Sequence, residues 1–198
     1  MVLGMYREKL QKIFVWTIAV IAVVHSPPAF GQWTGQGSGT ISDPYLISSE
    51  LDLINIRAEL TKNSMTNSAA TQGKYFRQTV DIVLSPTLYT ACDFFYGNYD
   101  GNGYFISGLK LPTSGGNGHG LFGECHGGTF NNIGLLNVDI NAGNRGVGAL
   151  MGQGKDVIIE NCYATGKVSS AGQGYEVGGL VGVLIGDCTV TSSYFSGE

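Results

Sequence analysis

Hydrophobic residues form one long run near the N-terminus of this chain and, after it, many short runs separated by glycine and polar residues. The long run, Ile13 to Val24, follows a basic segment (residues 7–12) and is followed by a Pro-Pro pair. Ala29 and Gly31 then supply the small-x-small pattern that signal peptidase accepts, so we expect residues 1–31 to be a signal peptide. The run is too short to cross a hydrocarbon core of about 30 Å as a helix, which disfavours a permanent membrane anchor.

The next segment predicts a lead-in and then a cap for a larger β structure. Residues 32–42 are rich in glycine, glutamine, serine and threonine, so we expect a flexible lead-in. Folded structure is predicted from residue 43, with a short strand at 45–47 and a helix that runs from a capping box at Ser49 and Asp52 to Leu60. Such a helix can cover the open edge of the first coil of a solenoid.

Residues 43–114 as a whole are predicted to form this N-terminal cap. Alternation over residues 75–84 predicts one strand, with Phe76, Gln78, Val80, Ile82 and Leu84 on the same side. The sequence Asp100-Gly101-Asn102-Gly103 predicts a tight turn that leads into Tyr104, Ile106 and Leu109.

Residues 115–198 contain an internal repeat. One unit occurs three times, and its last glycines are 29 and 30 residues apart: Gly120-Leu121-Phe122-Gly123, Ala149-Leu150-Met151-Gly152 and Gly179-Leu180-Val181-Gly182. A second marker follows each copy: Asn132-Ile133-Gly134-Leu135, Asn161-Cys162-Tyr163-Ala164 and Ser192-Ser193-Tyr194-Phe195. This period, with short β-like pieces and glycine corners, predicts an all-β fold, a right-handed parallel β-helix or solenoid with coils of about 30 residues. Leu121, Leu150 and Leu180 are expected to stack, as are Phe122, Met151 and Val181.

These repeats resemble the GLUG-motif family of extracellular bacterial proteins, which is named for its Gly-Leu-hydrophobic-Gly core. The resemblance extends to Asp43-Pro44-Tyr45-Leu46-Ile47 before a helix and to Asn161-Cys162-Tyr163-Ala164-Thr165-Gly166. It implies a secreted or surface-exposed β-helical domain, commonly one module of a longer adhesin-like protein, and in some members attached to an IgA-specific metallopeptidase. It implies no shared catalytic chemistry. The residues that carry it have structural roles in this interpretation: Gly120, Leu121, Gly123, Leu150, Gly152, Gly179, Leu180, Gly182, Cys162 and Tyr163. The sequence departs from the pattern at Gly134 and at Ser192-Ser193.

Charge and cysteine content narrow the partners that we expect. The chain has 11 Lys plus Arg and 15 Asp plus Glu, and the predicted signal peptide holds three of the basic residues and one acidic residue. The remaining chain is therefore acidic, which disfavours nucleic acid and anionic membranes as partners.

Export permits disulfides, and the four cysteines Cys92, Cys125, Cys162 and Cys188 form an even set with three complete connectivities. Cys162, however, lies in an apolar strand pattern that is typical of a buried free thiol.

Two groups of residues have partial metal-site patterns. Asn98, Asp100 and Asn102 have the opening spacing of a calcium loop, but the closing position is Leu109, so a structural turn is favoured and no cofactor is expected. The histidines His119 and His126 lie near Glu124 and Cys125, without the helical spacing of a zinc protease.

No nucleophile motif occurs, so we do not expect an enzyme. The alternative is a polysaccharide-active β-helix that uses carboxylates on neighbouring coils. Its candidate acids are Asp139, Asp156, Glu160 and Asp187, and its candidate bases are Lys110, Arg145, Lys155 and Lys167.

Aromatic residues give the candidate binding surface. They are densest between residues 89 and 104, and we assign the surface to Phe95, Tyr96 and Tyr99. The sequence thus predicts a secreted or cell-surface, noncatalytic, adhesin-like module that binds glycans or proteins. A structural spacer is the other alternative, in which further domains, such as a peptidase, follow Glu198.

Overall fold

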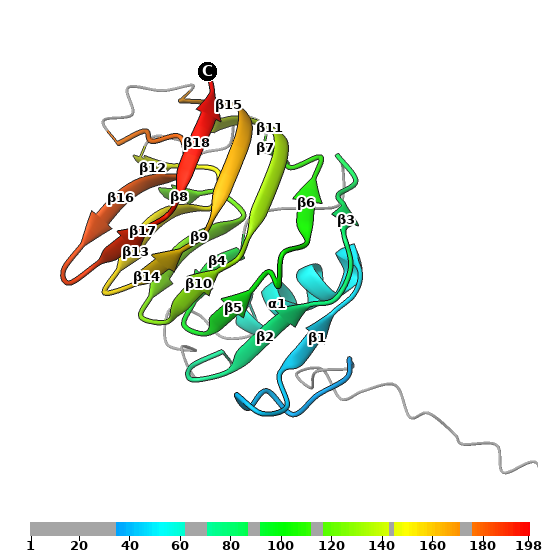
Figure 1. Cartoon of the computed structure of the whole chain (residues 1–198). Coiled ribbons are helices and arrows are strands. Elements are labelled where there is room, and N and C mark those ends of the chain that lie inside the picture. The colour runs from blue at the N-terminus through cyan, green and yellow to red at the C-terminus, as the bar shows by residue number, and fades with distance from the viewer. Residues whose placement is uncertain (1–34, 62–70, 87–91, 112–116, 143–144, 171–175) are drawn as a thin grey trace, which may run out of the picture.

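The protein is a parallel β-solenoid in which short strands follow one another around a common axis (Figure 1). Its interior is hydrophobic. The computed structural model describes residues 35–61, 71–86, 92–111, 117–142, 145–170 and 176–198. Every strand pair within these ranges is parallel, and the sheets run along the solenoid axis. The predicted all-β parallel solenoid is confirmed.

Three long sheets and one short sheet form the faces of the solenoid. Sheet A contains, in spatial order, β1 (Tyr45–Ile47), β2 (Tyr75–Gln78), β5 (Asn98–Asp100), β10 (Thr129–Asn131), β14 (Ile158–Glu160) and β17 (Thr189–Thr191). Sheet B contains β3 (Ile82–Val83), β6 (Phe105–Ser107), β11 (Gly134–Ala142), β15 (Tyr163–Ser170) and β18 (Tyr194–Gly197), and β7 (Lys110–Leu111) also pairs with β11. Sheet C contains β4 (Cys92–Phe95), β9 (Phe122–His126), β13 (Met151–Lys155) and β16 (Val181–Ile185), and sheet D contains β8 (Asn117–His119) and β12 (Arg145–Val147).

The chain visits these sheets in a fixed order, and one complete coil consists of β10, β11, β12 and β13. Equivalent residues of successive coils therefore lie in register. In sheet C, Phe122 pairs with Met151 and Met151 with Val181, as the 29- and 30-residue spacing predicts. The leucine column is confirmed as well, because Phe122 N donates to Leu150 O and Leu150 N donates to Leu180 O, both at 2.9 Å.

The interior is aromatic toward the first coils and aliphatic after them. Phe95, Phe122 and Phe130 are buried, with ring centroids 4.8 Å apart for Phe95 and Phe122 and 5.2 Å apart for Phe122 and Phe130. Ile159 and Met151 take the equivalent places one coil further on and are also buried. Tilted and edge-on ring pairs of this kind add to the free energy of burying the rings themselves.

The glycines of the repeat unit let two backbones approach closely. A Cβ on Gly152 would collide with the main-chain N of His119 in β8, and a Cβ on Gly182 would collide with that of Val147 in β12. The last glycine of the unit is therefore the point where sheet C passes against sheet D of the preceding coil. Gly134 is also required by a close contact, since a side chain there would collide with the ring of Tyr163. The Tyr163 ring stacks in turn on that of Tyr194, with centroids 5.6 Å apart.

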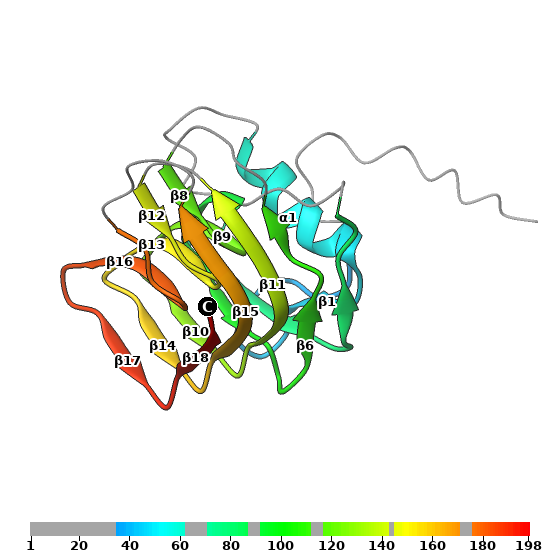
Figure 2. The same ribbon diagram turned by 90° about the horizontal axis from the view of Figure 1, so that it is seen from above.

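Helix α1 (Glu50–Thr61) covers the first strands, as predicted (Figures 1 and 2). Ser49 caps the helix as predicted, because Asp52 N donates to Ser49 Oγ at 3.2 Å, while Asp52 Oδ2 accepts from Ser48 N at 2.9 Å, one residue before the N–H that a strict capping box uses. Leu53 and Ile56 lie on the inner side of the helix and are buried. The strands nearest to the helix are β4 and β1.

Three predictions about the N-terminal part of the chain are wrong. The solenoid begins with β1 and β2 rather than at residue 115, since the strands of the predicted cap already pair within sheets A, B and C. The strand predicted over residues 75–84 is two strands, because the chain turns a corner between β2 and β3 and exposes Val80 there. The described part of the lead-in, from residue 35, is a compact turn rather than a flexible segment: Gly39 N donates to Asp43 O, and Leu46 N donates to Gln36 O.

Candidate functional site

The aromatic surface predicted from the sequence does not exist as such. Phe95 and Tyr99 are completely buried, because inward positions alternate with outward ones along each strand and both residues fall on inward positions. Tyr96 alone of the three is partly exposed, and its ring stacks on His126 with centroids 5.0 Å apart. Phe95 and Tyr99 therefore belong to the core, and the binding surface lies elsewhere.

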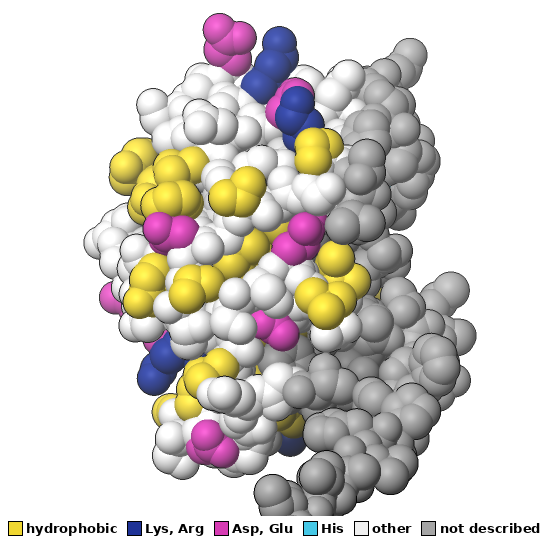
Figure 3. Space-filling model, turned by 90° about the vertical axis from the view of Figure 1, so that its right-hand side faces the viewer, with side chains coloured by type: hydrophobic (Ala, Val, Ile, Leu, Met, Phe, Trp, Pro, Cys, Tyr) yellow, Lys and Arg dark blue, Asp and Glu magenta, His cyan; other side chains and the backbone are white. Residues whose placement is uncertain are grey.

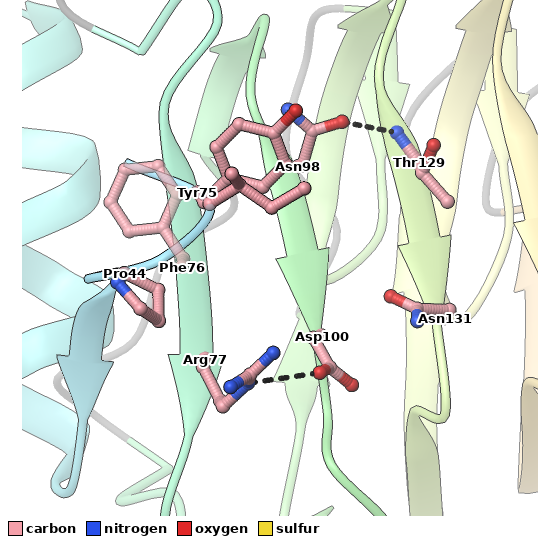
Figure 4. Close-up of a pocket in the computed structure, with 9 residues that line it drawn as sticks. Pro44, Tyr75, Phe76, Arg77, Asn98, Asp100, Thr129 and Asn131 are labelled. Atoms are coloured by element: carbon pink, nitrogen blue, oxygen red, sulfur yellow. Dashed lines mark hydrogen bonds and ion pairs between the residues drawn. The ribbon is translucent and has the colours of Figure 1, made fainter. Parts of the chain in front are cut away.

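A hollow of about 330 Å³ lies on the outer face of sheet A, across β2, β5 and β10 (Figure 4). The strand register places two rows of side chains side by side on this face. The first row is Tyr75, Asn98 and Thr129, and the second is Arg77, Asp100 and Asn131. Ile41 and Pro44 complete the rim on the side of β1.

Hydrogen bonds fix the middle of this hollow. Asn98 Oδ1 accepts from Thr129 N at 3.1 Å, and its Nδ2 donates to Lys74 O at 3.3 Å. Asp100 Oδ1 accepts from Asn102 N at 2.8 Å and from Asn132 Nδ2 at 3.0 Å, while Oδ2 accepts from Arg77 Nε at 3.0 Å. Asn98 and Asp100 therefore hold neighbouring coils together and position Arg77.

The remaining side chains present binding groups to solvent. The Arg77 side chain is 45% exposed even though its Nε is paired with Asp100. Tyr75 supplies a phenol ring, Thr129 a hydroxyl and Asn131 an amide, and all three side chains line the hollow (Figure 4). An aromatic face beside several uncharged polar groups and one compensated ion pair is suited to a polar, uncharged ligand with an apolar face.

A pattern in the sequence could have located these residues. Tyr75-Phe76-Arg77, Asn98-Tyr99-Asp100 and Thr129-Phe130-Asn131 each have an aromatic residue between two polar ones. The structure buries the central residue of each triplet and turns the flanking residues outward. The density of aromatic residues in this part of the chain does not by itself separate the two faces of each strand.

The residues with the opening spacing of a calcium loop form a corner. Asn102 adopts a left-handed conformation with φ 54°, and its Nδ2 donates to Gln78 O at 3.3 Å. Asp100 Oδ1 accepts from Asn102 N and so stabilises the turn between β5 and β6, whereas Asn98 Oδ1 accepts from Thr129 N and links β5 to β10 of the next coil.

The histidines do not form one cluster with Glu124 and Cys125. Glu124 and His126 lie on the outer face of β9, with His126 Nε2 3.9 Å from Glu124 Oε2, whereas Cys125 between them is buried. His119 is also buried, in β8. In the part of the chain that the structure describes, no three His, Cys, Asp or Glu side chains are grouped as metal ligands.

The candidate acids and bases are distributed over several faces. Asp139 pairs with Lys110 at 3.4 Å on sheet B, next to Lys167 in the register, and Arg145 pairs with Glu176 at 3.6 Å near sheet D. Lys155 lies in β13 of sheet C. Asp156 Oδ1 accepts from Asp187 N at 2.9 Å at the corner between sheets C and A, and Glu160 lies in β14 of sheet A. These four carboxylates do not converge on one groove.

Cys162 and Cys188 are free thiols and Cys125 is buried, while the side chain of Cys92 lies outside the described part of the structure. Burial raises the pKa of the Cys162 thiol to about 11, although hydrogen bonding with the backbone of Ile133 and Glu160 acts in the opposite direction. Cys162 is therefore a core residue, as its strand pattern indicates.

The outer surface agrees with an acidic chain. On the side shown in Figure 3, acidic side chains are scattered among small hydrophobic patches, and the few basic side chains lie near acidic ones. Among the described residues, no helix has the length and apolar character that crossing a membrane requires.

Comparison with known proteins gives distant similarities. No family model matches the chain. The chain is 28% identical over 172 residues to halomucin from Haloquadratum walsbyi, a match that covers 81% of this chain and 2% of halomucin. The crystal structure of a candidate immunoglobulin A1 protease from Bacteroides ovatus superimposes with a TM-score of 0.49 and 16% sequence identity, over 81% of this chain and 69% of that one.

Proposed function

We propose that this chain is a noncatalytic, extracytoplasmic β-solenoid module that binds a neutral glycan in the hollow on sheet A. The observation that supports this proposal best is the placement of the partly exposed Tyr75 ring beside Arg77, Thr129 and Asn131 on three adjacent strands. Adjacent strands in a sheet are about 4.8 Å apart. The rows across β2, β5 and β10 are therefore comparable in length with one or two sugar rings.

Each group in the hollow has a defined part in such binding. The apolar C–H face of a pyranose packs on the phenol ring of Tyr75, and its hydroxyls exchange hydrogen bonds with Arg77, Thr129 and Asn131. Asn98 and Asp100 keep the strands and the guanidinium in place through their hydrogen bonds to neighbouring coils. A rigid, preformed site of this kind loses little conformational entropy on binding.

Electrostatics favours an uncharged ligand. Arg77 is the basic residue among those that line the hollow, and its charge is compensated by Asp100 at 3.0 Å. The chain as a whole carries a net charge of −4, which repels polyanions. A neutral oligosaccharide therefore fits the site better than a sulfated or uronic acid polymer.

The role of Asp100 supports binding rather than hydrolysis. Asp100 is the carboxylate among the lining residues, and its two oxygens accept hydrogen bonds from Asn102, Asn132 and Arg77. Glycoside hydrolysis by the usual mechanism needs two carboxyl groups that flank one bond, one of which can donate a proton. Both oxygens of Asp100 are already engaged by the turn and by Arg77, and no second carboxyl group among the described residues lines the hollow.

The location and family are part of the same proposal. The predicted signal peptide, the resemblance to GLUG-motif repeats and the similarity to halomucin, a protein named as a mucin, support a place outside the cytoplasm. The chain spans 2% of the length of halomucin.

A glycan-array screen with the exported protein tests the proposal. The informative variant is Tyr75→Ala, and the matched control is Tyr104→Ala, since Tyr104 is partly exposed at the corner after β5 but does not line the hollow. We expect binding to neutral glycans that Tyr75→Ala loses and Tyr104→Ala keeps. The absence of any bound glycan, or equal loss in both variants while both remain folded by circular dichroism, would contradict the proposal.

A further inference from the structure

The hollow is part of a longer strip of side chains on the outer face of sheet A. Thr129 and Asn131 of β10 lie in register with Ile158 and Glu160 of β14, so the two rows that line the hollow continue onto the next strand. Ile158 is 46% exposed because it points away from the core, with β10 and β17 paired on either side of its own strand. We call the two rows from β2 to β14 the axial strip, because they run along the solenoid axis.

On the β1 side, the axial strip ends at the turn formed by residues 35–43. Gly39 N donates to Asp43 O at 2.9 Å, and Gly39 O accepts from Tyr75 N at 3.1 Å, so hydrogen bonds fix the turn to itself and to β2. Ile41 of this turn is 71% exposed and lines the hollow together with Pro44. A ligand in the hollow meets Ile41 on this side, and a longer ligand therefore extends toward β14.

The two rows of the axial strip differ in chemistry (Figure 4). The first row has apolar surface at both of its ends, supplied by the ring of Tyr75 and the side chain of Ile158. The second row is polar throughout and consists of Arg77, Asp100, Asn131 and Glu160. A sugar chain has the same division, since the C–H faces of its rings are apolar and its hydroxyls lie around the ring edges.

The axial strip repeats at the distance between neighbouring strands. This distance is about 4.8 Å, and the four steps from β1 through β2, β5 and β10 to β14 give a length of roughly 19 Å. An extended chain of β-1,4-linked pyranoses advances by nearly the same distance per sugar unit and stays straight. A chain of α-1,4-linked pyranoses coils and leaves a straight strip after a short contact.

We propose that the axial strip binds a linear, uncharged, β-1,4-linked oligosaccharide that lies along the solenoid axis. One end of the oligosaccharide lies against Ile41, and its rings pass over Tyr75 and Ile158. This inference rests on the proposed function and adds to it the linkage of the glycan and its direction on the sheet. Since each sugar unit matches one step between strands, the strip holds about four units.

Isothermal titration calorimetry of the exported protein with cellobiose, cellotetraose and cellohexaose tests this inference. We expect the wild type to bind cellotetraose at least roughly tenfold more tightly than cellobiose, because the longer ligand also buries apolar surface of Ile158. The further gain from cellotetraose to cellohexaose should be small, since the strip is then filled. Maltohexaose, the α-linked control, should bind more weakly than cellohexaose.

Two matched variants locate the gain on the strip. Ile158→Ala should bind cellobiose like the wild type and cellotetraose roughly fivefold more weakly, because it removes apolar contact at the far end. Val83→Ala is the control, since Val83 is 72% exposed on β3 of sheet B, and it should bind all ligands like the wild type. Both changes shorten exposed side chains, and circular dichroism checks that both variants are folded.

The length series also separates this inference from the proposed function. Equal affinities of the wild type for cellobiose and cellotetraose would overturn the inference, as would a gain with length that Ile158→Ala keeps in full. If the cello-oligosaccharides do not bind but another neutral glycan binds through Tyr75, the inference is wrong and the proposed function stands. If no glycan binds, both are wrong.

Discussion

Asn161 Nδ2 donates a hydrogen bond to Asn132 Oδ1 across two neighbouring coils, at 2.8 Å. Asn132 Nδ2 in turn donates to Asp100 Oδ1 at 3.0 Å. Both asparagines occupy the corner between sheets A and B with φ values of 53° and 56°, a left-handed conformation that asparagine tolerates better than other side chains apart from glycine. The corner residue of the second repeat marker is thus selected for its backbone conformation and for its place in an amide ladder.

Asn132→Ala should destabilise the protein by about 2 to 4 kcal/mol, because it loses two hydrogen bonds and forces a Cβ residue into the left-handed region. Asn132→Gly should cost only about 1 to 2 kcal/mol, since glycine accepts that conformation. Urea denaturation measures both free energies of unfolding. Equal values for the two variants would show that the left-handed φ contributes nothing.

Gly152→Ala should be among the most damaging single-atom additions in the chain. The new Cβ would meet main-chain atoms of His119 and Gly146, which cannot move without separating sheets C and D. We expect a loss of about 1 to 3 kcal/mol or failure to fold. Gly73→Ala is the control, because Gly73 has open space around its Cβ position and only its φ of 66° opposes the change. Thermal unfolding of both variants should rank Gly152→Ala clearly lower.

Alkaline pH should unfold the protein partly through Cys162. The folded-state pKa of this thiol is about 11, raised by burial from an ordinary value of 9.0, so the folded state favours the protonated form. The associated stability, about 2 to 3 kcal/mol, is complete below pH 9 and is lost as the pH rises toward 11, where the unfolded thiol has already ionised. Burial raises the pKa of Tyr99 in the same direction, and the nearby charges of Asp100 and Asp52 add to it.

Urea denaturation between pH 8 and pH 11 checks this expectation against Cys162→Ala. That variant should lose less stability than the wild type over the interval, although it starts from a lower value because it leaves a small cavity. Parallel losses in the two proteins would assign the alkaline sensitivity to other groups.

Much of the fold could be predicted from the sequence, because each coil of a solenoid has the same structural requirements as the next. The spacing of Gly152 and Gly182 reflects one close approach of sheet C to sheet D in successive coils, and Gly123 precedes them at the same interval, so the coil length could be predicted from these glycines. The start of the solenoid could not be predicted in the same way, since β2 and β5 lack the repeat unit and join sheet A through main-chain hydrogen bonds. The split of the strand predicted over residues 75–84 also depends on a tertiary feature, the corner at which Gln78 is buried and satisfied by Val80 O and Phe105 O.

The candidate site was harder to predict than the fold. Tyr99 and Phe95 are aromatic and close in sequence to Tyr96, but only the position of each residue in its strand decides whether it faces the core or solvent. Tyr75 and Asn131 are 56 residues apart in the chain and line one hollow only because β2, β5 and β10 stack in register. That relationship follows from the register of the coils, which the earlier coils do not mark clearly in the sequence.

Isothermal titration calorimetry with a neutral oligosaccharide selected on the array is the most direct test of the proposed function. The account predicts that the affinity of the wild type is nearly the same in about 50 mM and about 500 mM sodium chloride, because no net charge is recognised. It also predicts that Tyr75→Ala abolishes binding while Tyr104→Ala retains it. Binding that survives in Tyr75→Ala, or that weakens steeply with salt, would contradict recognition of a neutral sugar on the outer face of sheet A.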